Sequence, residues 1–145
     1  MINTVTESAD CHAAPAVACA RILSEEGLMA WWIGSVKVTE RDSKWPAPGT
    51  KLTWRAGGGT FRAKIVEDAR PHKVVMEVET PSAGSIITHT FTSLENGGTR
   101  YTKTVVPVLR TAIARFFGPL MVWMLRKFVR KEVQRAAAYA DSGKV

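Results

Sequence analysis

The chain has 145 residues, 46% of them apolar, and a formal net charge of +7. This length suits one ordinary domain with its own core, so a second domain is not expected. No stretch reaches the roughly 18 uncharged apolar residues that a membrane span needs, which excludes an integral membrane protein.

The N-terminal part of the sequence predicts a strand followed by two short helices. Three β-branched residues at positions 4–6 favour a first strand over residues 3–8. Pro15 suits the first turn of a helix, which alanine-rich sequence continues to Leu23. We expect Gly27 to separate this helix from a second one over residues 28–32.

Six segments in which apolar and polar residues alternate come next, and glycine or proline turns separate them. They cover residues 35–41, 50–55, 61–65, 74–79, 87–92 and 99–106. The turns are short, among them an Asn96-Gly97-Gly98 hairpin, whereas parallel strands need long crossovers. An antiparallel meander is therefore predicted. A bulge near residues 65–67 would exchange the inward and outward faces beyond it.

After Pro107 the apolar period changes from two to 3.6 residues, which predicts a long helix over about residues 111–140, with Gly118 and Pro119 as a point of interruption. One apolar row contains Phe117, Met121, Met124 and Phe128, and the adjoining row contains Val122, Leu125, Val129, Val133 and Ala137. Residues 110–135 include seven basic side chains and one acidic side chain, Glu132. Nearly all of the excess positive charge is therefore expected on this segment.

The order of elements resembles the START-like (SRPBCC) helix-grip superfamily, which includes plant pollen allergens of the Bet v 1 type and bacterial polyketide cyclase/dehydrase-like proteins. Local stretches are similar as well: Pro15-Ala16-Val17 at the first helix, Trp31-Trp32 at the second, the Pro48-Gly49-Thr50 turn before the strand with Trp54, residues 67–71, and Phe91 followed by residues 96–99. The resemblance covers about residues 4–140.

This resemblance implies an α+β helix-grip fold, in which a curved antiparallel sheet of about seven strands wraps around a long C-terminal helix. Two short helices follow the first strand. The whole chain, residues 1–145, is then a single START-like ligand-binding domain. The resemblance also implies a cavity between sheet and helix for lipids, sterols, polyketides or other apolar molecules, but it supplies no shared set of catalytic residues.

The alternation in two strands places three polar side chains on the inward face. Phe91 is too large and apolar to face water, so we expect its face of the strand, which includes His89, to point inward. On the next strand Tyr101 and Lys103 share a face with Val105. We hypothesise that His89, Tyr101 and Lys103 orient a ligand, or that His89 and Lys103 act as acid and base. Alternatively, His89 is a satisfied core residue and Lys103 reaches water at the mouth.

The predicted ligand-binding residues are Trp54, Phe61, Met76, His89, Tyr101, Lys103, Phe117, Met121, Met124 and Phe128. The leading function is the binding or carriage of a small hydrophobic ligand of the lipid, polyketide or aromatic type. A polyketide cyclase/dehydratase-like enzyme of the aromatase/cyclase type is the second candidate. The third is an interaction module that presents its C-terminal helix to a protein or a membrane.

The sequence contains no pattern typical of a metal, disulfide or cofactor site. Cys11 and Cys19 match no disulfide framework or zinc spacing, and the three histidines form no HxH or HxxxH pair, so neither a metal nor a cofactor is expected. The N-terminus lacks the basic and apolar regions of a signal peptide, which favours a cytoplasmic protein.

The basic helix has two interpretations. Arg126, Lys127, Arg130 and Lys131 share a side of the helix with Trp123, which suggests peripheral contact with an anionic membrane. A solubilising outer face is the alternative. Nucleic acid is not expected as a partner, because the basic stripe has no recognisable reading motif.

Overall fold

The computed structural model describes residues 4–32, 34–80, 83–109, 116 and 118–142. The strands are β1 (Val5–Cys11), β2 (Lys37–Arg41), β3 (Lys51–Ala56), β4 (Gly59–Ala69), β5 (Lys73–Glu79), β6 (Ala83–Ser93) and β7 (Thr99–Leu109). The helices within the described residues are α1 (Pro15–Leu23), α2 (Glu25–Trp31) and α4 (Gly118–Ser142). The sequence predicts that the long helix begins near residue 111. Residues 110–115 and 117 lie outside the described residues, so this start is not among them.

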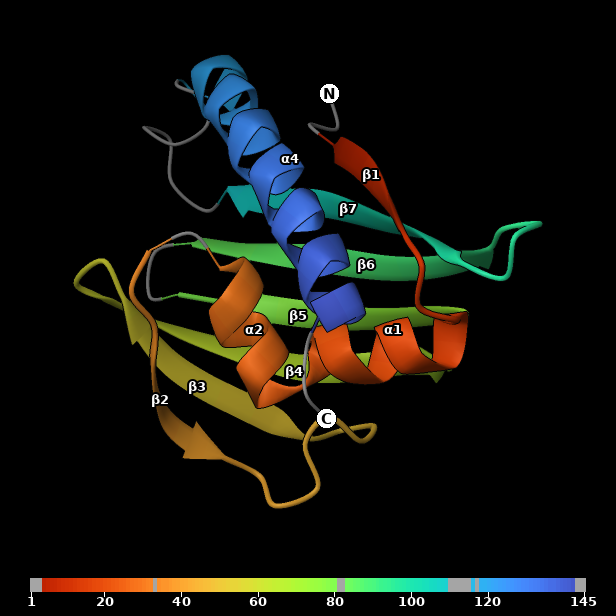
Figure 1. Ribbon diagram of the computed structural model, residues 1–145. Coiled ribbons are helices and arrows are strands. Elements are labelled where there is room, and N and C mark those ends of the chain that lie inside the picture. Colours follow the sequence, from red (N-terminus) through yellow and green to blue (C-terminus); the bar gives the residue numbers. More distant parts are fainter. Residues whose placement is uncertain (1–3, 33, 81–82, 110–115, 117, 143–145) are drawn as a thin grey trace.

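The strands form one antiparallel sheet in the order β1-β7-β6-β5-β4-β3-β2. Strands β2 to β7 follow one another as a meander, and β1 pairs with the last strand of the chain (Figure 1). The two short helices follow β1, and the long helix α4 comes last. The predicted α+β helix-grip fold is therefore confirmed.

Helix α4 runs diagonally across one face of the sheet, and α1 and α2 lie on the same face against its C-terminal part (Figure 1). Val129, Val133 and Ala140 on α4 are fully buried in this contact. Polar contacts fix the end of the helix: the Asp141 carboxylate accepts hydrogen bonds from the backbone N–H groups of His12 at 2.8 Å and Ala13 at 2.9 Å. The C-terminal half of α4 is thus anchored to the start of α1.

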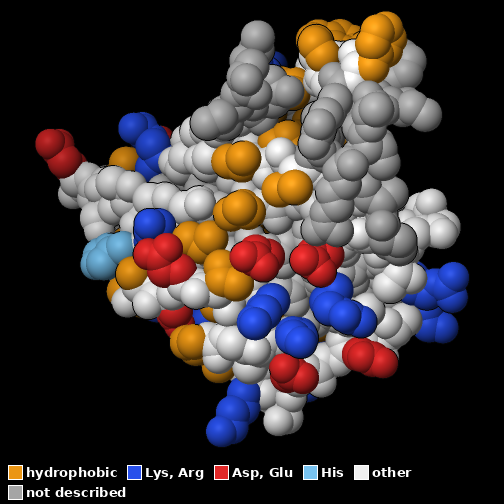
Figure 2. All heavy atoms as spheres, turned by 180° about the vertical axis from the view of Figure 1, so that it is seen from behind, with side chains coloured by type: hydrophobic (Ala, Val, Ile, Leu, Met, Phe, Trp, Pro, Cys, Tyr) orange, Lys and Arg blue, Asp and Glu red, His pale blue; other side chains and the backbone are white. Residues whose placement is uncertain are grey.

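The opposite face of the sheet is seen from behind in Figure 2. Basic and acidic side chains intermingle over its lower part, hydrophobic side chains run across its middle, and a further hydrophobic group lies at the upper end where α4 begins. Glu77 and Glu79 on β5 are exposed on this face, whereas Met76 and Val78 between and beside them are buried.

Gly27 does not separate the two short helices, so this prediction was wrong. The break lies at Ser24, whose hydroxyl accepts a hydrogen bond from the Gly27 N–H at 2.9 Å and thereby caps α2. Gly27 is buried inside α2, where a Cβ atom would stand 2.0 Å from the Arg21 carbonyl oxygen. Glycine is needed here for the close approach of α2 to the end of α1.

Two other features of the strands test the sequence pattern. The register shifts between Ile65 and Glu67 in β4, at the point where the sequence left room for a bulge. Strand β7 continues through Pro107 to Leu109, whereas the sequence suggested an end at Val106. Pairing with β1 reaches only Val105 within the described residues, so Pro107 lies beyond it, where the lack of an N–H group breaks no bond to β1.

Candidate functional site

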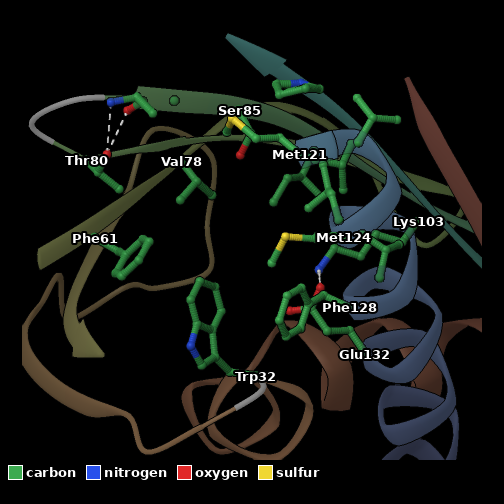
Figure 3. Close-up of a pocket in the computed structure, with 18 of the residues that line it drawn as sticks. Trp32, Phe61, Val78, Thr80, Ser85, Lys103, Met121, Met124, Phe128 and Glu132 are labelled. Atoms are coloured by element: carbon green, nitrogen blue, oxygen red, sulfur yellow. Dashed lines mark hydrogen bonds and ion pairs between the residues drawn. The ribbon is translucent and has the colours of Figure 1, made fainter. Parts of the chain in front are cut away.

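A cavity of about 510 Å³ lies between α4 and the part of the sheet that α1 and α2 leave uncovered (Figure 3). Its lining comes from the residue after α2 (Trp32), from β4 (Phe61), from β5 and the residue after it (Val78, Thr80), from β6 (Ala83, Gly84, Ser85, Ile87), from β7 (Lys103, Val105, Pro107) and from α4 (Gly118, Met121, Val122, Met124, Leu125, Phe128, Val129, Glu132). The wall is therefore mostly apolar.

Aromatic rings form one side of the cavity. The ring of Trp32 meets Phe61 edge to face at a centroid distance of 5.0 Å, and Trp54 stacks on Phe61 at 5.7 Å. Trp54 is buried behind these rings and does not line the cavity. The opposite side is formed by long flexible side chains of α4, whose Met121 and Met124 face Phe61 and Trp32 in Figure 3. Methionine adapts to irregular shapes, so this wall suits ligands of varied outline.

One ion pair interrupts the apolar wall. The Lys103 ammonium nitrogen Nζ donates a hydrogen bond to the Glu132 carboxylate oxygen Oε1 at 3.1 Å, and the two side chains are 2% and 11% exposed. The same nitrogen lies 4.0 Å from the centroid of the Trp31 ring. Burial lowers the pKa of Lys103, and the negative charge of Glu132 opposes that shift. The pair thus places a proton donor and a proton acceptor at the cavity wall.

His89 and Tyr101 form a second polar pair, which lies in the core. The hydroxyl of Tyr101 and Nδ1 of His89 are 2.7 Å apart, and their rings stack with centroids 5.8 Å apart. Burial lowers the pKa of His89 well below its usual value, and the charge of Lys103 adds to this effect. Burial also raises the pKa of Tyr101 well above its usual value. Both side chains are therefore neutral near pH 7.

The structure brings half of the predicted ligand-binding residues to the cavity. Phe61, Lys103, Met121, Met124 and Phe128 line it. Trp54, Met76, His89 and Tyr101 point inward but lie in the packed core, and Phe117 is outside the described residues. His89 does not line the cavity because Trp31, at the end of α2, covers it; the two ring centroids are 6.3 Å apart. Lys103 does not reach water, contrary to the alternative considered for it.

Among the lining residues that the sequence did not indicate, Trp32 adds an aromatic ring and Glu132 adds a carboxylate to the site. Glu132 was counted only as the one acidic residue in a basic segment. It follows Val129 by three positions and precedes Ala136 by four, so it shares the buried side of α4 with them. A carboxylate within an apolar row was the signal that could have identified it.

The described residues do not indicate a metal site or a reactive cysteine. No group of three His, Cys, Asp or Glu side chains within them is arranged to hold a metal ion. Cys11 and Cys19 are free and buried, and burial raises the pKa of Cys19 to about 11, which disfavours its thiolate form. Lys103 and Glu132 are therefore the ionisable groups of the cavity lining.

Comparisons with known proteins agree with this architecture. The family model described as polyketide cyclase / dehydrase and lipid transport matches residues 3–141. None of the curated proteins matches the chain. Among solved structures, Ms6760 from Mycobacterium smegmatis is 17% identical, with a TM-score of 0.71 over 98% of this chain and 93% of its own. TTHA0849 from Thermus thermophilus is 16% identical, with a TM-score of 0.69 over 94% of this chain and 96% of its own.

A third structure is DynU16, a protein of the dynemicin biosynthetic locus. It is 16% identical with a TM-score of 0.66, and the match covers 98% of this chain but only 48% of DynU16. The TM-scores of these three structures show a shared fold. The family model spans nearly the whole chain, so the chain belongs to the polyketide cyclase/dehydrase and lipid-transport family. The resemblance inferred from the sequence is thereby confirmed.

Proposed function

We propose that the protein binds or carries a small hydrophobic molecule of the lipid, polyketide or aromatic type between α4 and the sheet. The cavity carries this proposal, because its volume of about 510 Å³ falls within the range of known small-molecule sites, about 300–1,000 Å³. Its walls offer mainly aliphatic, aromatic and thioether groups. Burial of apolar ligand surface against them supplies the driving force for binding.

The Lys103–Glu132 pair determines where a ligand can carry a polar group. Lys103 and Glu132 lie on one side of the cavity in Figure 3, away from Phe61 and Val78. A ligand with an apolar body and one neutral oxygen function satisfies this arrangement, because the oxygen can accept a hydrogen bond from Lys103 while the body fills the remaining space.

A matched pair of substitutions on β6 tests the cavity. Ile87 is buried and lines it, whereas the adjacent Ile86 is exposed on the outer face of the sheet. In Ile87→Trp the larger ring occupies ligand space, so the affinity for a fluorescent apolar probe should fall by at least about tenfold. Ile86→Trp should bind the probe as the unmodified protein does. Equal probe affinity in both variants would contradict the proposal.

Native mass spectrometry supplies an independent test. Protein purified from its own host should retain a small apolar molecule, which the Ile87→Trp variant should lose and the Ile86→Trp variant should keep. Its mass would define the ligand class. If no retained molecule and no probe binding are found, the cavity has no binding role.

An enzyme of the cyclase/dehydratase type is the second candidate, and the Lys103–Glu132 pair favours it. Dehydration of a β-hydroxy ketone needs a base to remove a proton beside the carbonyl group and an acid to protonate the leaving hydroxyl. The two side chains lie 3.1 Å apart on the cavity wall, close enough to share both tasks. We expect the double variant Lys103→Met/Glu132→Leu to abolish such turnover, followed by the absorbance of the enone. No turnover by the unmodified protein would reject this candidate.

Contact with an anionic membrane is a separate proposal for the outer side of α4. Trp123 is 56% exposed, and Lys127 Nζ lies 3.8 Å from the centroid of its ring. Arg130 is partly engaged elsewhere, since it pairs with Glu7 at 3.2 Å. In the part of the chain that the structure describes, no helix is long and apolar enough to cross a bilayer, so contact would be peripheral.

Liposome flotation tests this proposal. The protein should float with vesicles that contain anionic lipid at low salt, and Trp123→Ser should float less, whereas Ile86→Ser on the opposite face of the molecule should not change flotation. Failure of the unmodified protein to float would exclude the membrane contact and leave ligand binding untouched.

A further inference from the structure

The amine of Lys103 has surroundings unlike those of the other described lysines. It is the one buried lysine among the described residues, and it lines the cavity. Within those residues, Glu132 is its hydrogen-bond partner, and the Trp31 ring lies beside it. An amine that is held in an apolar space beside a carboxylate has the two features of a nucleophilic lysine: reduced hydration of the ammonium form and a neighbouring base.

We propose that Lys103 captures aldehyde or ketone ligands as an imine, with Glu132 as the group that moves the protons. This inference rests on the proposed binding of apolar molecules in the cavity and adds a chemical class, because a carbonyl carbon is the atom that a neutral amine attacks. The ligand is then an apolar aldehyde or ketone whose carbonyl group lies at the Lys103–Glu132 pair.

The steps balance without any further reagent. Glu132 takes a proton from the Lys103 ammonium, and the freed nitrogen lone pair forms a bond to the carbonyl carbon while the carbonyl oxygen receives a proton from Glu132. Glu132 next removes a proton from the new C–N nitrogen and returns it to the hydroxyl group. The C–O bond breaks, water leaves, and a protonated imine remains opposite the Glu132 carboxylate.

The geometry conserves the local charge through this sequence. One cation and one anion are present before the reaction, and one iminium cation and the same carboxylate are present after it. The ion pair and the contact with Trp31 are therefore retained, with no unpaired buried charge.

Reductive trapping tests the proposal on the full chain. The protein is incubated with naphthaldehyde and cyanoborohydride, and labelled lysines are located by peptide mass spectrometry. Lys64 on β4 is exposed and serves as the internal reference. We expect labelling of Lys103 to exceed that of Lys64 by at least about tenfold, because Lys103 combines a bound carbonyl group with a neighbouring proton acceptor.

Two further measurements assign the role of Glu132. Glu132→Gln keeps the size of the side chain and a hydrogen-bonding oxygen but cannot accept the proton, so the rate of Lys103 labelling should fall by at least about tenfold. Affinity for naphthalenemethanol, which has the same apolar body and no carbonyl group, is measured in parallel, and the labelling rate is corrected for any change in occupancy of the cavity. If the variant does not fold, the ratio of Lys103 to Lys64 labelling in the unmodified protein still decides the proposal.

The possible results separate this inference from the proposed function. If naphthalenemethanol binds but Lys103 is labelled no faster than Lys64, imine formation is refuted and apolar binding stands. If the alcohol also fails to bind and Lys103 is not labelled, both are refuted. Fast labelling of Lys103 that is unaffected by Glu132→Gln would refute the role of Glu132 as the proton carrier.

Discussion

Along α4, the side chains of Val129, Val133 and Ala140 that face the rest of the molecule are buried, whereas Met121 and Phe128 remain 40% and 45% exposed. Small residues line the buried half and allow α4 to approach β1, α1 and α2 closely. Longer side chains line the other half, where the cavity separates the helix from the sheet. One helix thus packs as core at its C-terminal end and forms the wall of a binding site at its N-terminal end.

Glu132 lies where the two halves meet. It is followed by the buried Val133 and Ala136, and it pairs with Lys103 across the space between α4 and β7. The pair joins the helix to the sheet at the inner end of the cavity. We therefore expect the energetics of this pair to show whether the two halves of α4 are coupled.

The largest expected effect is that of breaking the pair. Lys103→Met leaves the Glu132 carboxylate buried without its partner, so the free energy of unfolding should fall by about 3–5 kcal/mol in urea denaturation. The double variant Lys103→Met/Glu132→Leu removes both charges and should recover most of this loss. If the single variant is as stable as the double variant, the pair does not join the halves of α4.

A smaller effect should distinguish packing in the two halves. Val133→Ala opens a cavity in a fully buried position and should lower the free energy of unfolding by about 2 kcal/mol. Met124→Ala removes a side chain that is nearly half exposed, so the change should stay within about 0.5 kcal/mol. Similar losses in both variants, measured by the same denaturation experiment, would show that the N-terminal half is packed as tightly as the C-terminal half.

The sequence predicted the inner face of the sheet well where the strands are regular. β6 and β7 pair without a register shift, so the alternation of His89 and Phe91 correctly gave their buried side. Alternation does not show what covers an inward side chain. His89 and Lys103 stand directly opposite each other in the register, yet Trp31 covers His89 while Lys103 lines the cavity. That difference depends on where α2 ends in space.

The helical part was predicted in a similar way. The row with Val129, Val133 and Ala137 is buried, and the row with Met121, Met124 and Phe128 flanks the cavity. Periodicity identified both rows but not the distance of each from the sheet. The volume left between elements depends on tertiary packing, and the contribution of Trp32 to its wall follows from a turn that periodicity does not describe.

The smallest expected effect is a pH dependence of stability that arises from His89. This side chain lies in the packed core beside Tyr101 and Lys103. Burial lowers the pKa of His89 in the folded protein well below the usual value of 6.5, which the unfolded chain retains. Below about pH 6.5 the unfolded state therefore binds more protons, and folding stability falls as the pH falls, by at most about 1.4 kcal/mol for each pH unit. Above that pH the contribution of His89 to stability is complete.

His89→Gln replaces the imidazole with an amide that does not titrate, while Tyr101 keeps a hydrogen-bonding neighbour. The free energy of unfolding of this variant should depend less on pH than that of the unmodified protein between about pH 7.5 and about pH 5.5, measured by urea denaturation. His12 and His72 are exposed and present in both proteins, so their contributions cancel in the difference. If the free energies of unfolding of the two proteins change with pH in parallel, His89 gains a proton in the folded protein. The region beneath α2 would then be open to water, as the cavity is.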